Sequence, residues 1–240
     1  MMNEIAQMKT TDYEDLFVRN DLNPTVFSPK AGYEISLGQD RESLEDIEFY
    51  KNFIKNAIAQ FRHSKLYKSY KAHLMSDIGI NCCQYHSAIR SHEEEEMAKI
   101  EMHHHILTIF DIAYIMTEHI INSGGILTTF DLVKMLAIEH TEHRVATVML
   151  CKTCHQLQHH DPSFFLPTGM AFGNWVEFLQ RYQRGVSRDI YYKILYILKK
   201  EITMYDPSEK RALQLISIAN TLEDWSAKNA YFFGDSGINM

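Results

Sequence analysis

The sequence predicts an α+β protein that is predominantly α-helical, and three observations lead to this prediction. Beyond residue 43, apolar residues recur every three or four positions over most of the chain, as on the buried face of a helix. Two segments break that pattern: residues 99–106 are short enough for a strand, and residues 145–150 are apolar and β-branched. The composition is that of a globular protein, since 45% of the 240 residues are hydrophobic and 23% are charged.

The first part of the chain divides into an arm and a helical region. Residues 1–43 are expected to form an irregular arm, because Pro, Gly, Asn and Asp are scattered through them without a regular period. Residues 44–78 are expected to be helical, with Ser43 and Asp46 supplying an N-cap and an acidic first turn. This helix is expected to continue or restart until Gly79 ends it.

The central region, residues 79–165, is predicted to hold both strands and a following short helix, with a helical insertion at 107–140 between the strands. Within the insertion, the helical spacing over 108–121 ends at a Gly-Gly pair, which is typical of a helix stop. Thr128 or Thr129 then supplies the N-cap of a second helix.

The last region, residues 166–240, is expected to be entirely helical. A short helix over 175–182 should follow Gly173, and Ser187 should cap a helix over 188–202. Asp206-Pro207 combines a capping side chain with a proline suited to the first helical position, which predicts the start of a last long helix.

Charge and hydropathy constrain the expected partners and cellular location of the protein. The formal net charge is −7, which disfavours a nucleic-acid binder that relies on bulk electrostatics. A local basic patch is still expected, from residues clustered in the sequence: Lys65, Lys68, Lys71, Arg181, Arg184, Arg188, Lys193, Lys199 and Lys200. No apolar run is long enough to span a bilayer and no secretory signal is evident, so we expect a cytoplasmic protein without membrane contact.

Histidine and cysteine are concentrated in the central region. Of 13 histidines, only His63 and His73 lie outside the segment from His86 to His160. In a reducing compartment the four cysteines favour metal ligation or plain burial over disulfides. Three protein ligands with an open position are typical of a catalytic metal, whereas four Cys or His ligands are typical of structural zinc. The sequence therefore predicts metal binding.

Two strings carry a family resemblance: Glu101-Met-His-His-His105, and Cys151-Lys-Thr-Cys-His-Gln-Leu-Gln-His159. Glu-x-His-His on a strand, then a second strand, then Cys-x-x-Cys-His-x-x-x-His opening a helix, resembles the HNH or ββα-metal endonucleases, which include many phage and mobile-element enzymes. The resemblance covers about residues 80–165. It implies a small ββα-metal core with a zinc knuckle, embellished by N- and C-terminal helices.

The resemblance also implies an activity, the hydrolysis of DNA phosphodiester bonds with the help of a metal ion. His103 matches the strand-borne ligand of a catalytic divalent metal (Mg²⁺, Mn²⁺, Ni²⁺ or Zn²⁺), and His104 matches the general base. His155 and His159 match the helix-borne ligands, and residues four apart share one face of a helix. A frame one residue later, with His104 as ligand and His105 as base, is the less favoured alternative.

The same resemblance implies a structural Zn²⁺ site. Its four ligands match Cys83, His86, Cys151 and Cys154, with Cys82 as the competing ligand from the first knuckle.

One position departs from the family pattern. The asparagine that orients the base histidine or helps to bind metal falls here near Ala146 or Thr147, and His140, Glu142 or His143 are the candidate substitutes. This departure sustains an alternative function, a catalytically degenerate HNH-fold zinc module that acts in binding or regulation. A histidine-rich metal-binding or hydrolytic enzyme unrelated to nucleic acid is a third hypothesis. DNA is the expected partner, and the surrounding helices offer a surface for a possible homodimer.

Overall fold

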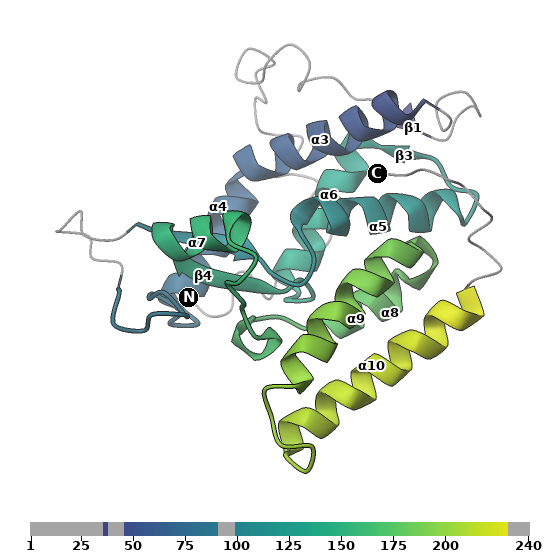
Figure 1. Cartoon of the computed structure of the whole chain (residues 1–240). Coiled ribbons are helices and arrows are strands. Elements are labelled where there is room, and N and C mark those ends of the chain that lie inside the picture. Colours follow the sequence, from purple (N-terminus) through teal and green to yellow (C-terminus); the bar gives the residue numbers. More distant parts are fainter. Residues whose placement is uncertain (1–35, 38–45, 91–98, 230–240) are drawn as a thin grey trace.

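The computed structural model describes residues 36–37, 46–90 and 99–229, and within these ranges the predicted fold class is confirmed, because the chain is α+β and mostly helical (Figure 1). Eight α-helices lie in these ranges: α3 (Ile47–His63), α4 (Lys65–Ser76), α5 (Ile109–Ile121), α6 (Thr129–Thr141), α7 (Lys152–His160), α8 (Trp175–Arg181), α9 (Arg188–Ile202) and α10 (Lys210–Asn229). The same ranges contain four short strands: β1 (Ser36–Leu37), β2 (Ile100–His104), β3 (Leu127–Thr128) and β4 (Thr147–Cys151).

The helical region before Gly79 consists of two helices rather than one. The Asp46 carboxylate accepts hydrogen bonds from the backbone N–H groups of Glu48 and Phe49, both at 3.0 Å, and so caps α3. The predicted cap Ser43 lies outside the described residues. Ser64 adopts an extended conformation that ends α3, and its hydroxyl accepts from Tyr67 N–H at 3.2 Å to cap α4.

The predicted insertion forms α5 and α6, each of which begins with a capping box. Thr108 pairs with Asp111 at the start of α5, and Thr128 pairs with Asp131 at the start of α6, so Thr128 rather than Thr129 is the cap. The small strand β3 just before α6 pairs with β1, which places buried Leu37 against the helices. The arm is therefore not irregular at residues 36–37, and the rest of it lies outside the described residues.

The strand–strand–helix element lies beside this helical body. β2 and β4 are antiparallel, with His103 opposite Val148 and His104 opposite Thr147, and α7 follows β4 directly. β2 is shorter than the predicted 99–106 because it ends before Ile106, whose φ of 71° is left-handed and turns the chain. β4 lies slightly later than predicted, and α7 begins at Lys152 rather than at His155.

Two hydrophobic clusters hold the described residues together. The larger cluster is formed by α3, α5, α6 and the C-terminal helices, and α9 and α10 pack side by side (Figure 1). The smaller cluster surrounds β2 and β4 and includes Tyr70, Leu74 and three cysteines. Asn174 caps α8, and Ser187 caps α9 as predicted. α10 begins at Lys210 rather than at Pro207, because Asp206, Ser208 and Glu209 form a separate hydrogen-bonded turn.

A search of the described ranges for a helix long and apolar enough to cross a membrane finds none.

His140, a fully buried residue of α6, is expected to make stability depend on pH. Burial lowers the pKa of His140 to about 4, whereas an unfolded histidine titrates near 6.5. Below about pH 6.5 the unfolded chain binds the extra proton, so stability falls with falling pH by about 2 kcal/mol between pH 6.5 and 5 from this residue. Urea unfolding of the zinc-saturated protein at both pH values measures the loss, which should be smaller by that amount in His140→Gln. His160→Gln, which replaces an exposed histidine, should match the wild type; equal pH slopes for all three proteins would contradict the prediction.

Candidate metal centres

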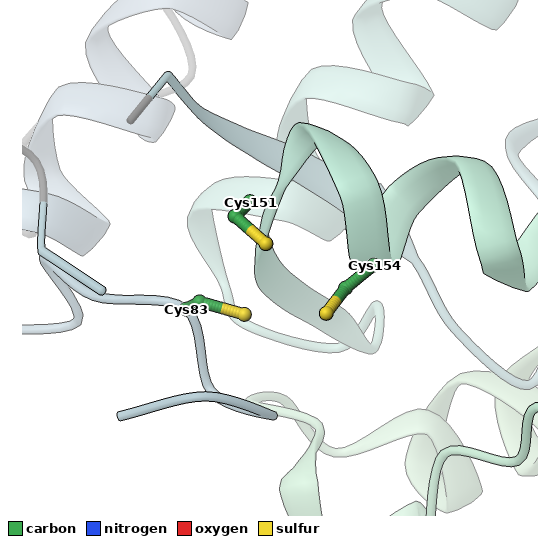
Figure 2. Close-up of side chains that lie close together, drawn as sticks. All are labelled: Cys83, Cys151 and Cys154. Carbon is green, nitrogen blue, oxygen red and sulfur yellow. The ribbon is translucent and has the colours of Figure 1, made fainter. Parts of the chain in front are cut away.

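Three buried thiols converge where β4 passes into α7 (Figure 2). Cys151 is the last residue of β4, Cys154 lies in the first turn of α7, and Cys83 comes from the loop after α4. Their Sγ atoms all lie within 4.8 Å of one another, and all four cysteines of the chain are free of disulfides. Soft thiolate donors packed at this separation suit a tetrahedral ion such as Zn²⁺.

The loop that carries Cys83 is attached to β4 through its neighbour Gln84. The Gln84 backbone N–H donates to the Met149 carbonyl at 2.8 Å, and the Met149 N–H donates to the Gln84 side-chain oxygen at 2.7 Å. These two bonds fix the loop beside the strand and bring Cys83 to the other two thiols. The sequence carries no local signal for this attachment, because the partners lie far apart in the chain.

Hydrogen bonding separates the acidities of the thiols. Burial acts to raise the pKa of Cys83, but hydrogen bonds from the backbone of Cys151, His86 and Tyr85 outweigh it and lower the pKa. Burial raises the pKa of Cys154 to about 12, and hydrogen bonds with Cys151 and Cys83 add to the shift. A cation bound by the three thiols would instead favour the thiolate form of Cys154, because metal ligation deprotonates a coordinating thiol.

His86 and Cys82, the other knuckle candidates, do not join the thiol group. The His86 side chain is exposed and its ring packs on Tyr85 at 5.0 Å, while its backbone N–H donates to Cys83 Sγ at 3.3 Å. Cys82 is partly buried and lies in an isolated bridge with Arg90. Three of the four predicted zinc ligands are thus together, and the fourth stays a prediction.

A second group joins one strand histidine to two helix histidines. Ring nitrogens of His103 on β2 and of His155 and His159 on α7 all lie within 4.8 Å of one another. The His103 ring centroid is 5.1 Å from each of the other two, which are 4.9 Å apart. Burial, followed by repulsion from His155, lowers the pKa of His103 to about 3, so its ring is neutral and can ligate at neutral pH.

Glu101 is a member of this site that we did not assign from the sequence. Its Oε2 accepts from His155 Nδ1 at 2.7 Å, which leaves Nε2 of His155 for a metal. Burial acts against the charged carboxyl, but the bonds from His155 and Lys99 outweigh it and lower the pKa of Glu101. The alternation of side chains along β2 predicts this placement of Glu101 beside His103, because residues 101 and 103 share one face of a strand.

Removing the charge of Glu101 is expected to weaken metal binding at the histidine group. Outer-shell carboxylates of this kind typically contribute about 10- to 100-fold to affinity, so Glu101→Gln should bind Ni²⁺ or Zn²⁺ about tenfold more weakly. Isothermal titration of protein already loaded with zinc at the thiols measures the second binding event. Glu142→Gln, which removes an exposed carboxylate, should leave that event unchanged, and an unchanged affinity in Glu101→Gln would contradict the role.

His104 faces away from the histidine group, as expected for the next residue of a strand. Its Nε2 lies 2.8 Å from Nε2 of His140, and burial followed by repulsion from His140 lowers its pKa well below the usual value. Of the three candidate substitutes for the missing asparagine, His140 is therefore the one in contact with His104. Thr147 instead lies 3.5 Å from the Tyr70 hydroxyl.

His104 and the three residues of the histidine group line one pocket of about 610 Å³, which we call the histidine pocket. His104 reaches it from one side of β2, while His103, His155 and His159 reach it from the other. Arg62, Lys71 and Lys99 line the same pocket, and Lys71 Nζ is fixed there by a 3.0 Å hydrogen bond to the Ile100 carbonyl. Burial, followed by repulsion from Lys99, lowers the pKa of Lys71.

The remaining basic residues of the predicted patch are not part of this pocket. Arg188 and Lys199 line a separate groove of about 590 Å³ between α9 and α10, where Lys199 pairs with Glu223 at 2.8 Å. The basic residues that are close together in the sequence therefore lie apart in the fold, and of them only Lys71 lines the histidine pocket.

Comparison with known proteins places the chain in a family of phage proteins. The family described as "Bacteriophage G278-like virion protein" matches residues 13–226 of this chain. No curated protein and no solved structure matches it significantly.

Proposed function

Because the chain belongs to the bacteriophage G278-like virion protein family, we propose that it is a phage-particle protein that hydrolyses DNA at a metal-dependent, HNH-like endonuclease site. The observation that carries this proposal is the convergence of His103, His155 and His159 in the pocket that His104 also lines. In this proposal β2, β4 and α7 are the ββα-metal core, and the thiols hold its structural zinc. The destination of the protein is then the virion rather than the cytoplasm alone.

The donor set of the histidine pocket fits a catalytic ion. Three neutral imidazoles leave coordination positions open, and Glu101 orients one of them. A divalent ion held there would stabilise negative charge on the phosphate and the leaving oxygen. Zn²⁺ and Ni²⁺ suit imidazole better than Mg²⁺, which prefers oxygen ligands.

The chain's own residues supply the remaining steps. His104, neutral at pH 7, takes the proton from the attacking water. Arg62, Lys71 and Lys99 offer positive charge to the phosphates on either side of the cleaved bond. These three cations favour a polyanionic substrate locally, although the whole chain carries a net charge of −7.

Plasmid cleavage tests the proposal. Purified protein is incubated with supercoiled plasmid and Mg²⁺, Mn²⁺, Ni²⁺ or Zn²⁺, and nicked or linear product is expected with at least one of them. His104→Ala should reduce the rate by about 10²- to 10⁴-fold, the usual contribution of a general base, with the fold retained. A folded wild type that cleaves with none of these metals would overturn the proposal.

The alternative is a degenerate HNH-fold zinc module that binds DNA or another virion component without cleaving it. Two observations favour it: His104 is only 7% exposed, and the asparagine position is taken by Ala146 and Thr147, which do not contact its ring nitrogens. Elemental analysis separates the two functions, because the alternative expects one tightly bound zinc per chain and no second ion sensitive to His103→Ala. The predicted homodimer stays a prediction, which sedimentation of the purified protein would test.

A further inference from the structure

His104 is held by a hydrogen bond that fixes where its proton lies. Its Nε2 is 2.8 Å from Nε2 of His140, so one of these two nitrogens carries the hydrogen and the other accepts it. Both rings are buried, with 7% and 0% of their surfaces exposed, so water does not compete for the bond.

The main chain of α6 decides which nitrogen donates. Nδ1 of His140 lies 2.6 Å from the Leu136 carbonyl oxygen, which can only accept a hydrogen bond. Nδ1 of His140 therefore carries the hydrogen. A neutral imidazole has a single N–H, so Nε2 of His140 is left as an acceptor, and the buried ring is neutral at pH 7.

The bond to His140 then dictates the state of His104. Because Nε2 of His140 accepts, Nε2 of His104 must be the donor, and the lone pair of a neutral His104 ring lies on Nδ1. Nδ1 is the nitrogen of His104 that the bond to His140 leaves unused, and His104 is one of the residues that line the histidine pocket.

We infer that His140 is a positioning residue that holds His104 in its Nε2–H tautomer and so presents Nδ1 as the proton acceptor for the attacking water, an assignment that rests on the proposed nuclease function. The His140 ring is itself immobilised, because Phe61 and Tyr70 pack against it with centroids 4.6 and 5.3 Å away. The Leu136 carbonyl thus orients the His140 ring, and the His140 ring in turn orients the proposed base His104.

A measurement on the resting protein tests the tautomer without any cleavage. In zinc-loaded protein labelled with ¹⁵N-histidine, long-range ¹H–¹⁵N correlation spectra distinguish a protonated Nε2 from a protonated Nδ1, and His104→Gln assigns the signal. We expect His104 as Nε2–H and His140 as Nδ1–H. Observation of His104 as Nδ1–H would overturn the inference whether or not the protein cuts DNA.

Matched variants of His140 test its role in the reaction. His140→Gln places an amide oxygen near the lost Nε2 and keeps an acceptor, whereas His140→Leu fills a similar volume without one. We expect the leucine variant to lose about 10²-fold or more in kcat with little change in KM or bound metal, and the glutamine variant to recover most of that loss. His143→Asn, which does not touch His104, should behave as the wild type.

Two outcomes of the variant series are decisive. A folded His140→Leu protein that cleaves as fast as the wild type would overturn the inference while leaving the nuclease in place. If the wild type itself fails to cleave, the proposed function fails, and the spectra still decide whether His140 sets the tautomer of His104. Thermal unfolding of each variant identifies a loss of activity that comes from a loss of fold.

Discussion

Cys154→Ser is expected to abolish the structural zinc site that we propose at the thiols and to unfold the region around β2, β4 and α7. The Cys154 thiol is fully buried between Cys83 and Cys151, and all three belong to the smaller hydrophobic cluster. Structural zinc in small domains contributes on the order of 10–16 kcal/mol of binding free energy, which equals or exceeds the total stability of an ordinary domain. The apolar residues of the smaller cluster are too few to keep β2, β4 and α7 folded once this binding free energy is lost.

The measurement combines zinc content with a probe of local structure. Inductively coupled plasma mass spectrometry should show one zinc fewer per chain, and amide hydrogen exchange should show lost protection in β2 and β4 but retained protection in α3, α5 and α6. Cys82→Ser is the matched control, because Cys82 lies next to Cys83 but outside the thiol group, and it should keep both zinc and protection. A Cys154→Ser protein with a full zinc equivalent and native exchange would contradict the assignment.

His159→Ala is expected to remove the metal ion that we propose at the histidine group, and with it the proposed cleavage of DNA, without disturbing the fold. His159 is exposed, so its truncation costs little packing, yet its ring nitrogen completes the group with His103 and His155. Metal stabilisation of charge in the transition state is worth several kcal/mol, which corresponds to a fall in kcat/KM on the order of 10³-fold. The zinc at the thiols and the melting temperature should stay unchanged.

His160→Ala provides a closely matched control for this variant. His160 is the next residue of α7 and is also exposed, but it does not belong to the histidine group. It should retain two metal ions per chain and wild-type cleavage. Equal activity of the His159 and His160 variants would show that the histidine group is not the catalytic centre.

Features encoded by local chemistry could be predicted from the sequence. Ser187 caps α9 as predicted, and Thr128 caps α6 as one of the two predicted candidates. In each case the side-chain oxygen of an extended residue accepts from a free backbone N–H of the first helical turn, a rule that depends on near neighbours only. The shared face of His155 and His159 follows in the same way from the pitch of a helix. His103 joins them because antiparallel pairing places β2 beside the strand that leads into α7.

Features set by tertiary contacts could not be predicted in that way. The pairing of β1 with β3 involves two residues on each side, too few for a periodic pattern to register. The Asp206-Pro207 pair predicts the start of the last helix, but in the structure Asp206 hydrogen-bonds with Ser208 and Glu209 in a turn, and α10 begins only at Lys210. The contact of His140 with His104, and the exposed position of His86, depend on how distant elements pack.

The helical insertion between β2 and β4 has a consequence for the order in which the protein assembles during synthesis. His103 leaves the ribosome about 50 residues before His155, and the backbone N–H and C=O groups of β2 have no strand partner until β4 appears. Helices α5 and α6 make local contacts and can form in that interval. The remaining flexible loop is then shorter, and closing it costs about 1 kcal/mol less in chain entropy. Both metal-binding groups contain residues on each side of that loop, so each is complete only after the strands have paired. A nascent chain should therefore acquire the proposed metal ions, and with them the proposed nuclease activity, only after β4 and α7 have been synthesised and β4 has paired with β2.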